Sequence, residues 1–225
     1  MVSQYGDRPA VICRSPTTSA DALPGVAVPA SLETNLSYEA LDLASNAIAH
    51  SLRSLGVKKG DRVAVSLGNN PEFASLTYAI FKLGAILVPL NPGFNVKQVT
   101  AALNHLDVEL LIIGAVTDLA YKPCRGRSNL PLLQALVPDL ESGRIEAPEI
   151  PTLKNIVVVD NSASHPLSNF PPIASLRSLT PFHSLVPDLA SVRRSSAEAG
   201  IITPDSPLSA SDTVRPFSLV TPCTH

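Results

Sequence analysis

One serine in this chain has neighbours that suggest nucleophilic chemistry. Residues 64–68 read Ala-Val-Ser-Leu-Gly and differ at one position from the Gly-x-Ser-x-Gly pattern, which exposes a reactive serine on a sharp turn between a strand and a helix. The helix after Ser66 is expected to begin only beyond Asn70, so Ser66 falls within the expected strand. The sequence therefore favours a small polar residue inside a sheet, and a hydrolase that uses Ser66 is the weaker alternative.

Histidine is the most frequent general base, but the five histidines are not arranged for shared chemistry. His50 is expected on the polar side of a helix, and His105 at a helix end, where a cation complements the helix dipole. The other three lie in segments rich in proline and serine: His165, His183 and His225. No two of them have the spacing that chelates a metal from one helix face. We therefore assign no catalytic, cofactor-binding or metal-binding residue from the sequence.

Two turns could contact a ligand. Residues 89–93, Pro-Leu-Asn-Pro-Gly, follow the carboxyl end of an expected strand, the edge at which ligands bind in open α/β sheets. This position would place them near a substrate entrance, but two prolines and a glycine also describe a rigid turn, which is the interpretation we favour. Residues 59–61, Lys-Gly-Asp, precede their strand and are interpreted as a tight turn at the opposite edge.

These positions are spaced along an alternation of helices and strands. The first expected helix begins at Ser37 and ends at Gly56. The second begins after Asn70 and ends at Gly84, and the third begins near Asn95. Short apolar runs predict the strands: 62–67, 85–90 and 109–113. Continuous apolar strands separated by amphipathic helices indicate an α/β fold, with a doubly wound, mostly parallel sheet flanked and covered on both faces by helices.

The residues at these strands and turns resemble those of a known family. Residues 59–65 read Lys-Gly-Asp-Arg-Val-Ala-Val, residues 69–73 Asn-Asn-Pro-Glu-Phe, and residues 82–92 Lys-Leu-Gly-Ala-Ile-Leu-Val-Pro-Leu-Asn-Pro. In this order they look like the N-terminal part of the adenylate-forming, AMP-binding enzymes, and most of all like fatty acyl-CoA synthetases. The resemblance is clear over residues 5–114 and continues more loosely in three segments: 130–140, 153–160 and 209–214.

The resemblance implies an acid–CoA ligase that uses ATP, Mg²⁺ and coenzyme A. In such enzymes a fatty acid attacks ATP to give an acyl-adenylate and pyrophosphate, and the thiol of coenzyme A then displaces AMP. The first step needs cations and backbone N–H groups around the phosphates, which the family supplies with a loop rich in glycine, serine and threonine. By this resemblance, residues 1–214 are a partial N-terminal domain, in which residues 161–208 are dominated by proline- and serine-rich loops.

The expected phosphate loop is missing from these 225 residues. In the family, a segment like residues 212–214 leads through a strand into that loop, whereas residues 215–225 contain Pro216 and no glycine. We interpret residues 215–225 as a tail foreign to the family, from a shifted frame, a retained intron or a wrong exon, and the start as trimmed. The chain alone is expected to be inactive and to bind none of the three cofactors productively. The alternative is an inactive fragment that binds a partner or self-associates through unpaired sheet edges.

Composition argues against several other classes of protein. The net charge of −2 does not provide the excess of positive charge that binds nucleic acid. The longest apolar runs are shorter than the about 20 residues that a membrane span needs. The three cysteines, at 13, 124 and 223, lack metal-ligand spacing. The polar N-terminus does not resemble a secretory signal. We therefore expect an intracellular protein, with cytoplasm, peroxisome and mitochondrion all open.

Overall fold

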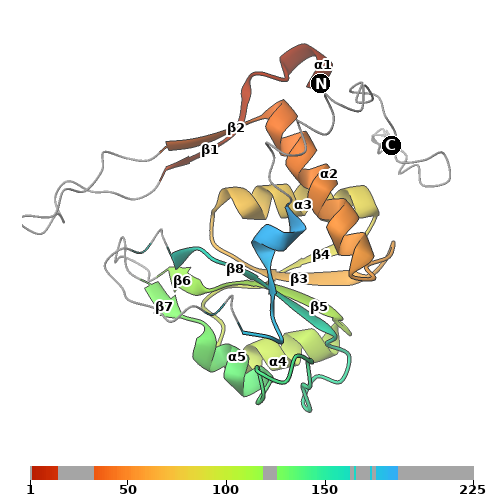
Figure 1. Cartoon of the computed structure of the whole chain (residues 1–225), viewed down its shortest axis with the longest axis vertical. Helices are drawn as coiled ribbons and strands as arrows, with labels where there is room; N and C mark the ends of the chain where they lie inside the picture. Colours follow the sequence, from red (N-terminus) through yellow and green to blue (C-terminus); the bar gives the residue numbers. More distant parts are fainter. Residues whose placement is uncertain are drawn as a thin grey trace, which may run out of the picture.

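A five-stranded parallel sheet forms the centre of the molecule (Figure 1). The computed structural model describes residues 2–14, 33–118, 126–162, 165, 173 and 176–186. The strands lie in the order β4-β3-β5-β8-β9, and every neighbouring pair is parallel. Their bounds are β3 Arg62–Ser66, β4 Ile86–Pro89, β5 Leu110–Gly114, β8 Asn155–Val159 and β9 Thr180–Pro181. The expected doubly wound, mostly parallel α/β sheet is confirmed.

The register of the sheet sorts its side chains onto two faces. Ala64 lies opposite both Val88 and Leu111, and Leu111 lies opposite Ile156. These residues belong to or pack against one buried cluster. The next row, with Val65 and its partners on β5 and β8, belongs to a second cluster on the other face. Because side chains alternate along a strand, each apolar strand contributes to both cores.

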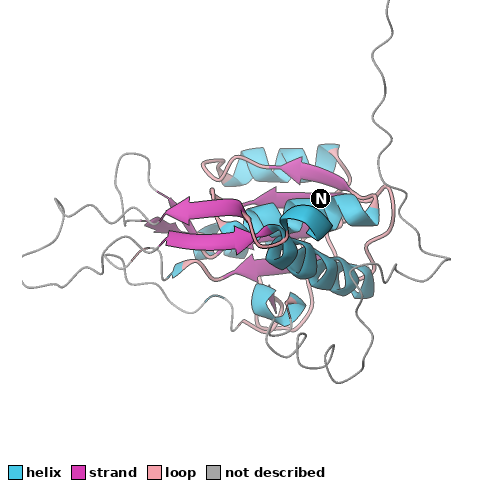
Figure 2. Cartoon of the chain, turned by 90° about the horizontal axis from the view of Figure 1, so that it is seen from above, coloured by secondary structure: helices cyan, strands magenta, loops and turns pink. Residues whose placement is uncertain are grey.

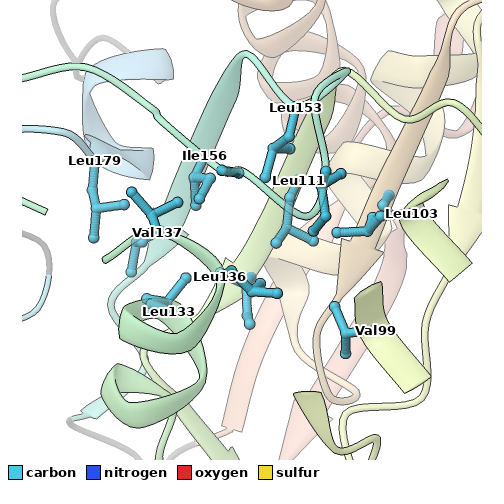
Figure 3. Packing of buried hydrophobic residues seen from close by; sticks show 14 of the residues in the cluster. Val99, Leu103, Leu111, Leu133, Leu136, Val137, Leu153, Ile156 and Leu179 are labelled. Carbon is cyan, nitrogen blue, oxygen red and sulfur yellow. The ribbon is translucent and has the colours of Figure 1, made fainter. Parts of the chain in front are cut away.

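Two pairs of helices cover the two faces (Figure 1). They are α2 Tyr38–Ser54 and α3 Pro71–Leu83 on one face, and α4 Val96–His105 and α5 Leu130–Leu136 on the other. Figure 3 shows Leu103 of α4 and Leu136 of α5 pointing toward Leu111 in the sheet. All three are nearly inaccessible to solvent, so removal of apolar surface from water holds this layer on the sheet.

The helix ends follow the local signals in the sequence. Ser37 accepts a hydrogen bond from the Ala40 N–H, and Asn70 accepts one from the Phe73 N–H. Asn95 forms a reciprocal capping box with Gln98. Helices α2 and α3 end before glycines in the left-handed region, with φ of 97° at Gly56 and 67° at Gly84. The predicted helix boundaries are therefore confirmed to within a residue or two.

The remaining elements lie outside the central sheet. They are α1 Val2–Tyr5, β1 Pro9–Arg14, β2 Glu33–Ser37, β6 Val116–Asp118, β7 Gly126–Ser128 and the 3-10 helix η3 Phe182–Leu185. Figure 2 shows β1 and β2 running side by side in opposite directions at one side of the molecule. The expected tail at 215–225 and much of the proline- and serine-rich segment at 161–208 lie outside the described residues.

Both edge strands of the central sheet contain a proline. Ile86 and Leu90 donate their N–H groups to β3 or its flank, at 2.7 and 2.9 Å, so the nitrogen of Pro89 between them faces the open side. Pro181 lies in the other edge strand. Prolines remove donors that a further strand would need, which opposes the predicted self-association through these edges. β4 is nevertheless covered on both faces, because Val88 packs against one buried cluster and Leu87 against the other, while Ile86 at its start is 47% exposed.

Candidate functional site

The carboxyl ends of β3, β5 and β8 meet at one edge of the sheet, where ligands bind in open α/β folds. Residues 67–70 leave this edge after β3, residues 115–118 after β5, and residues 160–162 after β8. The antiparallel pair β6 and β7 extends from it (Figure 1). We call the polar and glycine residues held together here the carboxyl-edge cluster: Gly68, Asp118, Asn129, Asn161 and His165.

A buried histidine orients an exposed acid in this cluster. The Nε2 atom of His165 lies 2.7 Å from Oδ1 of Asp118, and its Nδ1 atom lies 3.1 Å from the carbonyl oxygen of Asn161. The side chain of His165 is 2% exposed and that of Asp118 is 68% exposed. Each ring nitrogen thus lies within hydrogen-bond distance of an oxygen, and the tautomer decides which nitrogen donates. The pair thus holds a carboxylate in a fixed direction at the sheet edge.

Asn161 connects this pair to the backbone of β6. Its Oδ1 accepts the Val116 N–H at 2.9 Å, and its Nδ2 donates to the Val116 carbonyl at 2.8 Å. The side-chain amide therefore takes the place of a neighbouring strand for Val116. The space is tight, because a Cβ atom on Gly114 would lie 3.3 Å from the Asn161 amide. Asn161 consequently fixes the path of the chain from β5 into β6.

Asn129 also fixes the bend of the chain between β5 and β6. It is 3% exposed, its Nδ2 donates to the Gly114 carbonyl at 2.8 Å, and its Oδ1 accepts the Thr117 hydroxyl at 3.0 Å. The backbone N–H of Asn129 also donates to the Ala115 carbonyl at 3.0 Å. Buried polar groups of the bend are thereby satisfied without water. The carboxyl-edge cluster is a hydrogen-bonded support under an exposed carboxylate.

Gly68 allows Asp118 to approach the loop after β3. A Cβ atom at position 68 would lie 2.6 Å from Oδ2 of Asp118, whose other oxygen, Oδ1, lies 2.7 Å from Nε2 of His165. The φ angle of Gly68 is not positive, so the close approach and not the backbone conformation requires glycine here. Three segments distant in the sequence therefore converge at one carboxylate.

We expect Gly68→Ala to displace the Asp118 carboxylate, because its new Cβ atom would overlap Oδ2. Asp118 can turn into solvent, so the loss in unfolding free energy should be small, about 1 kcal/mol. The contact between Asp118 and His165 should weaken, which would shift the imidazole resonances of His165 in an NMR spectrum. Asn69→Ala, at the exposed neighbouring position, is the control and should shift neither. Unchanged His165 resonances in the Gly68 variant would contradict the contact.

A comparison with known families decides what kind of protein carries this edge. The family model described as AMP-binding enzyme matches residues 2–178. The chain belongs to the AMP-binding enzyme family. This result confirms the resemblance inferred from the segments at 59–65, 69–73 and 82–92.

Curated relatives of this AMP-binding chain include CoA ligases. The crotonobetaine/carnitine–CoA ligase of Salmonella paratyphi A is 36% identical over 96 residues, which are 43% of this chain and 19% of that protein. The protein of the same name from Proteus mirabilis is 29% identical over 133 residues, or 59% of this chain and 24% of that protein. The chain thus spans about a fifth to a quarter of the length of these relatives.

A solved structure of an acyl-CoA synthetase has the same fold. Acetoacetyl-CoA synthetase from Streptomyces lividans superposes with a TM-score of 0.54 at 19% sequence identity, over 69% of this chain and 21% of that chain. At this identity the match supports the fold alone. It agrees with the parallel sheet and its flanking helices.

The described part of the carboxyl edge of this AMP-binding chain does not fit the phosphates of ATP. A triphosphate requires cationic groups and converging backbone N–H donors. The described segments 67–70, 89–95, 114–118 and 160–162 contain no lysine or arginine, and the neighbouring strand β7 supplies one cation, Arg127. In the same described ranges, no group of three or more histidine, cysteine or carboxylate side chains could hold a metal ion. We therefore derive no step of ATP chemistry from these residues.

Ser66 does not form a nucleophile elbow. It is the last residue of β3, is 7% exposed and lies opposite Ile113 of β5. Residues 67–70 separate it from α3, so the sharp strand-to-helix turn of an α/β-hydrolase is not present at this serine. The ring nitrogens of His165 lie against Asn161 and Asp118 instead. The structure therefore does not support the alternative of a hydrolase that uses Ser66.

The structure distributes the other histidines over the surface. His50 and His183 are exposed, and His105 is the exposed last residue of α4, as its position in the sequence suggests. His225 lies outside the described residues. His165 was expected only to lie in a loop, and its burial against Asp118 is new. The two residues are 47 positions apart, so no local spacing could have indicated their contact.

The two candidate turns have different surroundings. Within residues 89–93, Oδ1 of Asn91 accepts the Gly93 N–H at 2.8 Å, and the Pro92 carbonyl lies 3.4 Å from the Thr117 hydroxyl. This rigid turn lies beside the carboxyl-edge cluster. The turn at 59–61 lies at the opposite edge, where Oδ2 of Asp61 accepts the Lys58 N–H at 2.7 Å. The turn interpretations therefore agree with the geometry.

Cys13 is the cysteine that the structure describes, and it is a free thiol on β1. Burial raises its pKa above the ordinary value, and the negative charge of Glu72 raises it further. The reactive thiolate is therefore less populated at neutral pH. Positions 124 and 223 lie outside the described residues. None of the helices in the described ranges has the length and apolar character needed to cross a bilayer.

Proposed function

We propose that these residues are the N-terminal part of an ATP-dependent acid–CoA ligase, which joins a carboxylic acid to coenzyme A through an acyl-adenylate. The family match over residues 2–178 carries this proposal, and relatives whose names state CoA ligation support it. ATP, Mg²⁺ and coenzyme A would serve the whole enzyme, with magnesium spreading the charge that develops on the phosphates.

For the acid, we propose a fatty acid of medium or long chain. This choice rests on the motifs at 59–65 and 82–92, which resemble those of fatty acyl-CoA synthetases. The curated relatives are named for crotonobetaine and carnitine, which are small acids with a quaternary ammonium group. The two kinds of acid differ in charge and length, so one assay with both distinguishes them.

We further propose that residues 1–225 alone do not catalyse the reaction. They span about a fifth to a quarter of the length of the relatives, and the described carboxyl edge offers one cation, Arg127, where a triphosphate needs several cationic groups. The contribution of these residues would be structural. The carboxyl-edge cluster and the turn at 89–93 would form part of the wall beside the substrate.

The test is exchange of labelled pyrophosphate into ATP, which reports the first half-reaction. Residues 1–225, purified, should give no exchange with palmitate, octanoate or crotonobetaine. A longer product in which a phosphate loop follows Val214 should give exchange that depends on a fatty acid. Exchange by residues 1–225 would overturn the proposed inactivity. Exchange of the longer product with crotonobetaine alone would overturn the fatty acid, and exchange with none of the acids would overturn the ligase assignment.

A further inference from the structure

Two adjoining cavities lie at the amino edge of the sheet, opposite the carboxyl-edge cluster. One has a volume of about 300 Å³ and lies between the starts of β3, β5 and β8, and the other has about 290 Å³ and lies beside the ends of α2 and α3. They share the wall at Gly56, Val57 and Lys58. We call the two together the amino-edge pocket. Its volume suits a ligand of a few non-hydrogen atoms to about a dozen.

Positive charge dominates the lining of this pocket. The lining cations are Arg53, Lys58, Lys59, Arg62 and Lys154, and the lining acids are Asp61 and Glu109. One cation and one acid neutralise each other, because Lys154 Nζ lies 2.8 Å from Glu109 Oε2. Asp61 then faces Lys58, Lys59 and Arg62, and its Oδ2 is already engaged by the backbone N–H of Lys58.

The ends of the neighbouring helices do not neutralise this charge. The C-terminal ends of α2 and α3 each add about half a negative unit charge, and cations near them are partly explained by this effect. With Asp61 included, the three cations Lys58, Lys59 and Arg62 still exceed the negative charge by about one unit. The residual charge is therefore available to an anionic ligand.

The shape of the pocket leaves room for such a ligand. Gly56, in the wall shared by the two cavities, has a φ angle of 97°, and no heavy atom lies within 4 Å of its Cβ position. The methylene groups of Lys59 lie against Gly84, whose Cβ position is 3.1 Å from Lys59 Cγ, and this contact restricts the direction of the side chain. Lys58 and Arg62 are exposed, so their charged ends can turn toward a bound molecule.

We propose that the amino-edge pocket binds a small phosphate-bearing dianion, through Lys58, Lys59 and Arg62. The planar guanidinium of Arg62 would hold two phosphate oxygens, and the two ammonium groups would hold others. This site lies at the edge of the sheet opposite the one where open α/β folds bind their main ligand. It does not depend on the proposed ligase activity.

The test is titration calorimetry of residues 1–225 with inorganic pyrophosphate at low ionic strength. We expect a dissociation constant on the order of 1 mM, as exposed charge pairs are individually weak, and further weakening as salt is added. The double variant Lys58→Gln/Arg62→Gln should bind at least about tenfold more weakly. Lys97→Gln removes an exposed lysine from α4 and is the matched control, which should bind as the unmodified chain does.

Misfolding of the double variant would also weaken the binding of pyrophosphate, so the test includes a second variant that is expected to bind it more tightly. Glu109→Gln removes an acid from the lining and releases Lys154, so pyrophosphate should bind about two- to threefold more tightly. Similar binding of AMP would assign recognition to a single phosphate group, and preference for pyrophosphate would assign it to both of its phosphate groups. Absence of binding up to about 10 mM, or equal binding by the double variant, would overturn the proposal, as would an equal loss in Lys97→Gln.

Discussion

Replacing Asn129 with alanine is expected to lower the free energy of unfolding by about 2–4 kcal/mol. The substitution removes the donor to the Gly114 carbonyl and the acceptor for the Thr117 hydroxyl. Both partners are buried, and a buried polar group left without a partner costs more than the hydrogen bond itself contributed. Urea denaturation should show a lower midpoint with an unchanged slope, which indicates a loss of stability without a change of mechanism.

The control for this prediction is an asparagine on the surface. Asn104 is exposed, and its Nδ2 donates to the Glu149 carbonyl at 2.6 Å. Because water can replace this bond, Asn104→Ala should lower the unfolding free energy by less than about 1 kcal/mol. Equal losses in the two variants would show that the bend between β5 and β6 is not held by Asn129.

Replacing Lys82 with methionine is expected to lower the unfolding free energy by about 1–3 kcal/mol. Lys82 on α3 reaches across to α2, where its Nζ lies 2.6 Å from Asp42 Oδ1 and 2.7 Å from both Ser45 Oγ and Asn46 Oδ1. Methionine keeps the apolar stem but supplies no donor. Asp42 is 40% exposed, so water can solvate it in the variant, and this limits the loss.

The matched control is the same substitution at an exposed ion pair. Lys154 lies 2.8 Å from Glu109, and the two side chains are 63% and 51% exposed. Lys154→Met should therefore change the unfolding free energy by less than about 0.5 kcal/mol. Thermal or urea unfolding measures both variants. A Lys82 variant as stable as the Lys154 variant would show that the contact between α2 and α3 depends on apolar packing alone.

Local signals made the elements of the first half predictable. A helix cap depends on a side chain and a backbone N–H three residues away, as at Ser37 and Asn70. A helix stop depends on one left-handed glycine, as at Gly84. The apolar runs at 62–67 and 109–113 indicated parallel strands covered on both faces, and these are the two strands next to each other at the centre of the sheet.

Sheet order was not available from the same signals. The apolar run at 85–90 resembles those of the central strands, yet β4 lies at the edge of the sheet and Ile86 is 47% exposed. An apolar pattern reports that a strand is buried on average, but not how many neighbours it has. The number of neighbours depends on where the chain returns after each crossover helix, which is a property of the whole fold.

The sequence by itself determined the family and the layered α/β core, because both depend on motifs and periodicities within short segments. Only the tertiary structure decided that Asp118 and His165 form a pair, since they are 47 residues apart. It also decided that Lys82 joins two helices, because Asp42 is 40 residues away. Such contacts depend on the register of strands and the packing of helices, and these are set by interactions along the whole chain rather than within one turn of it.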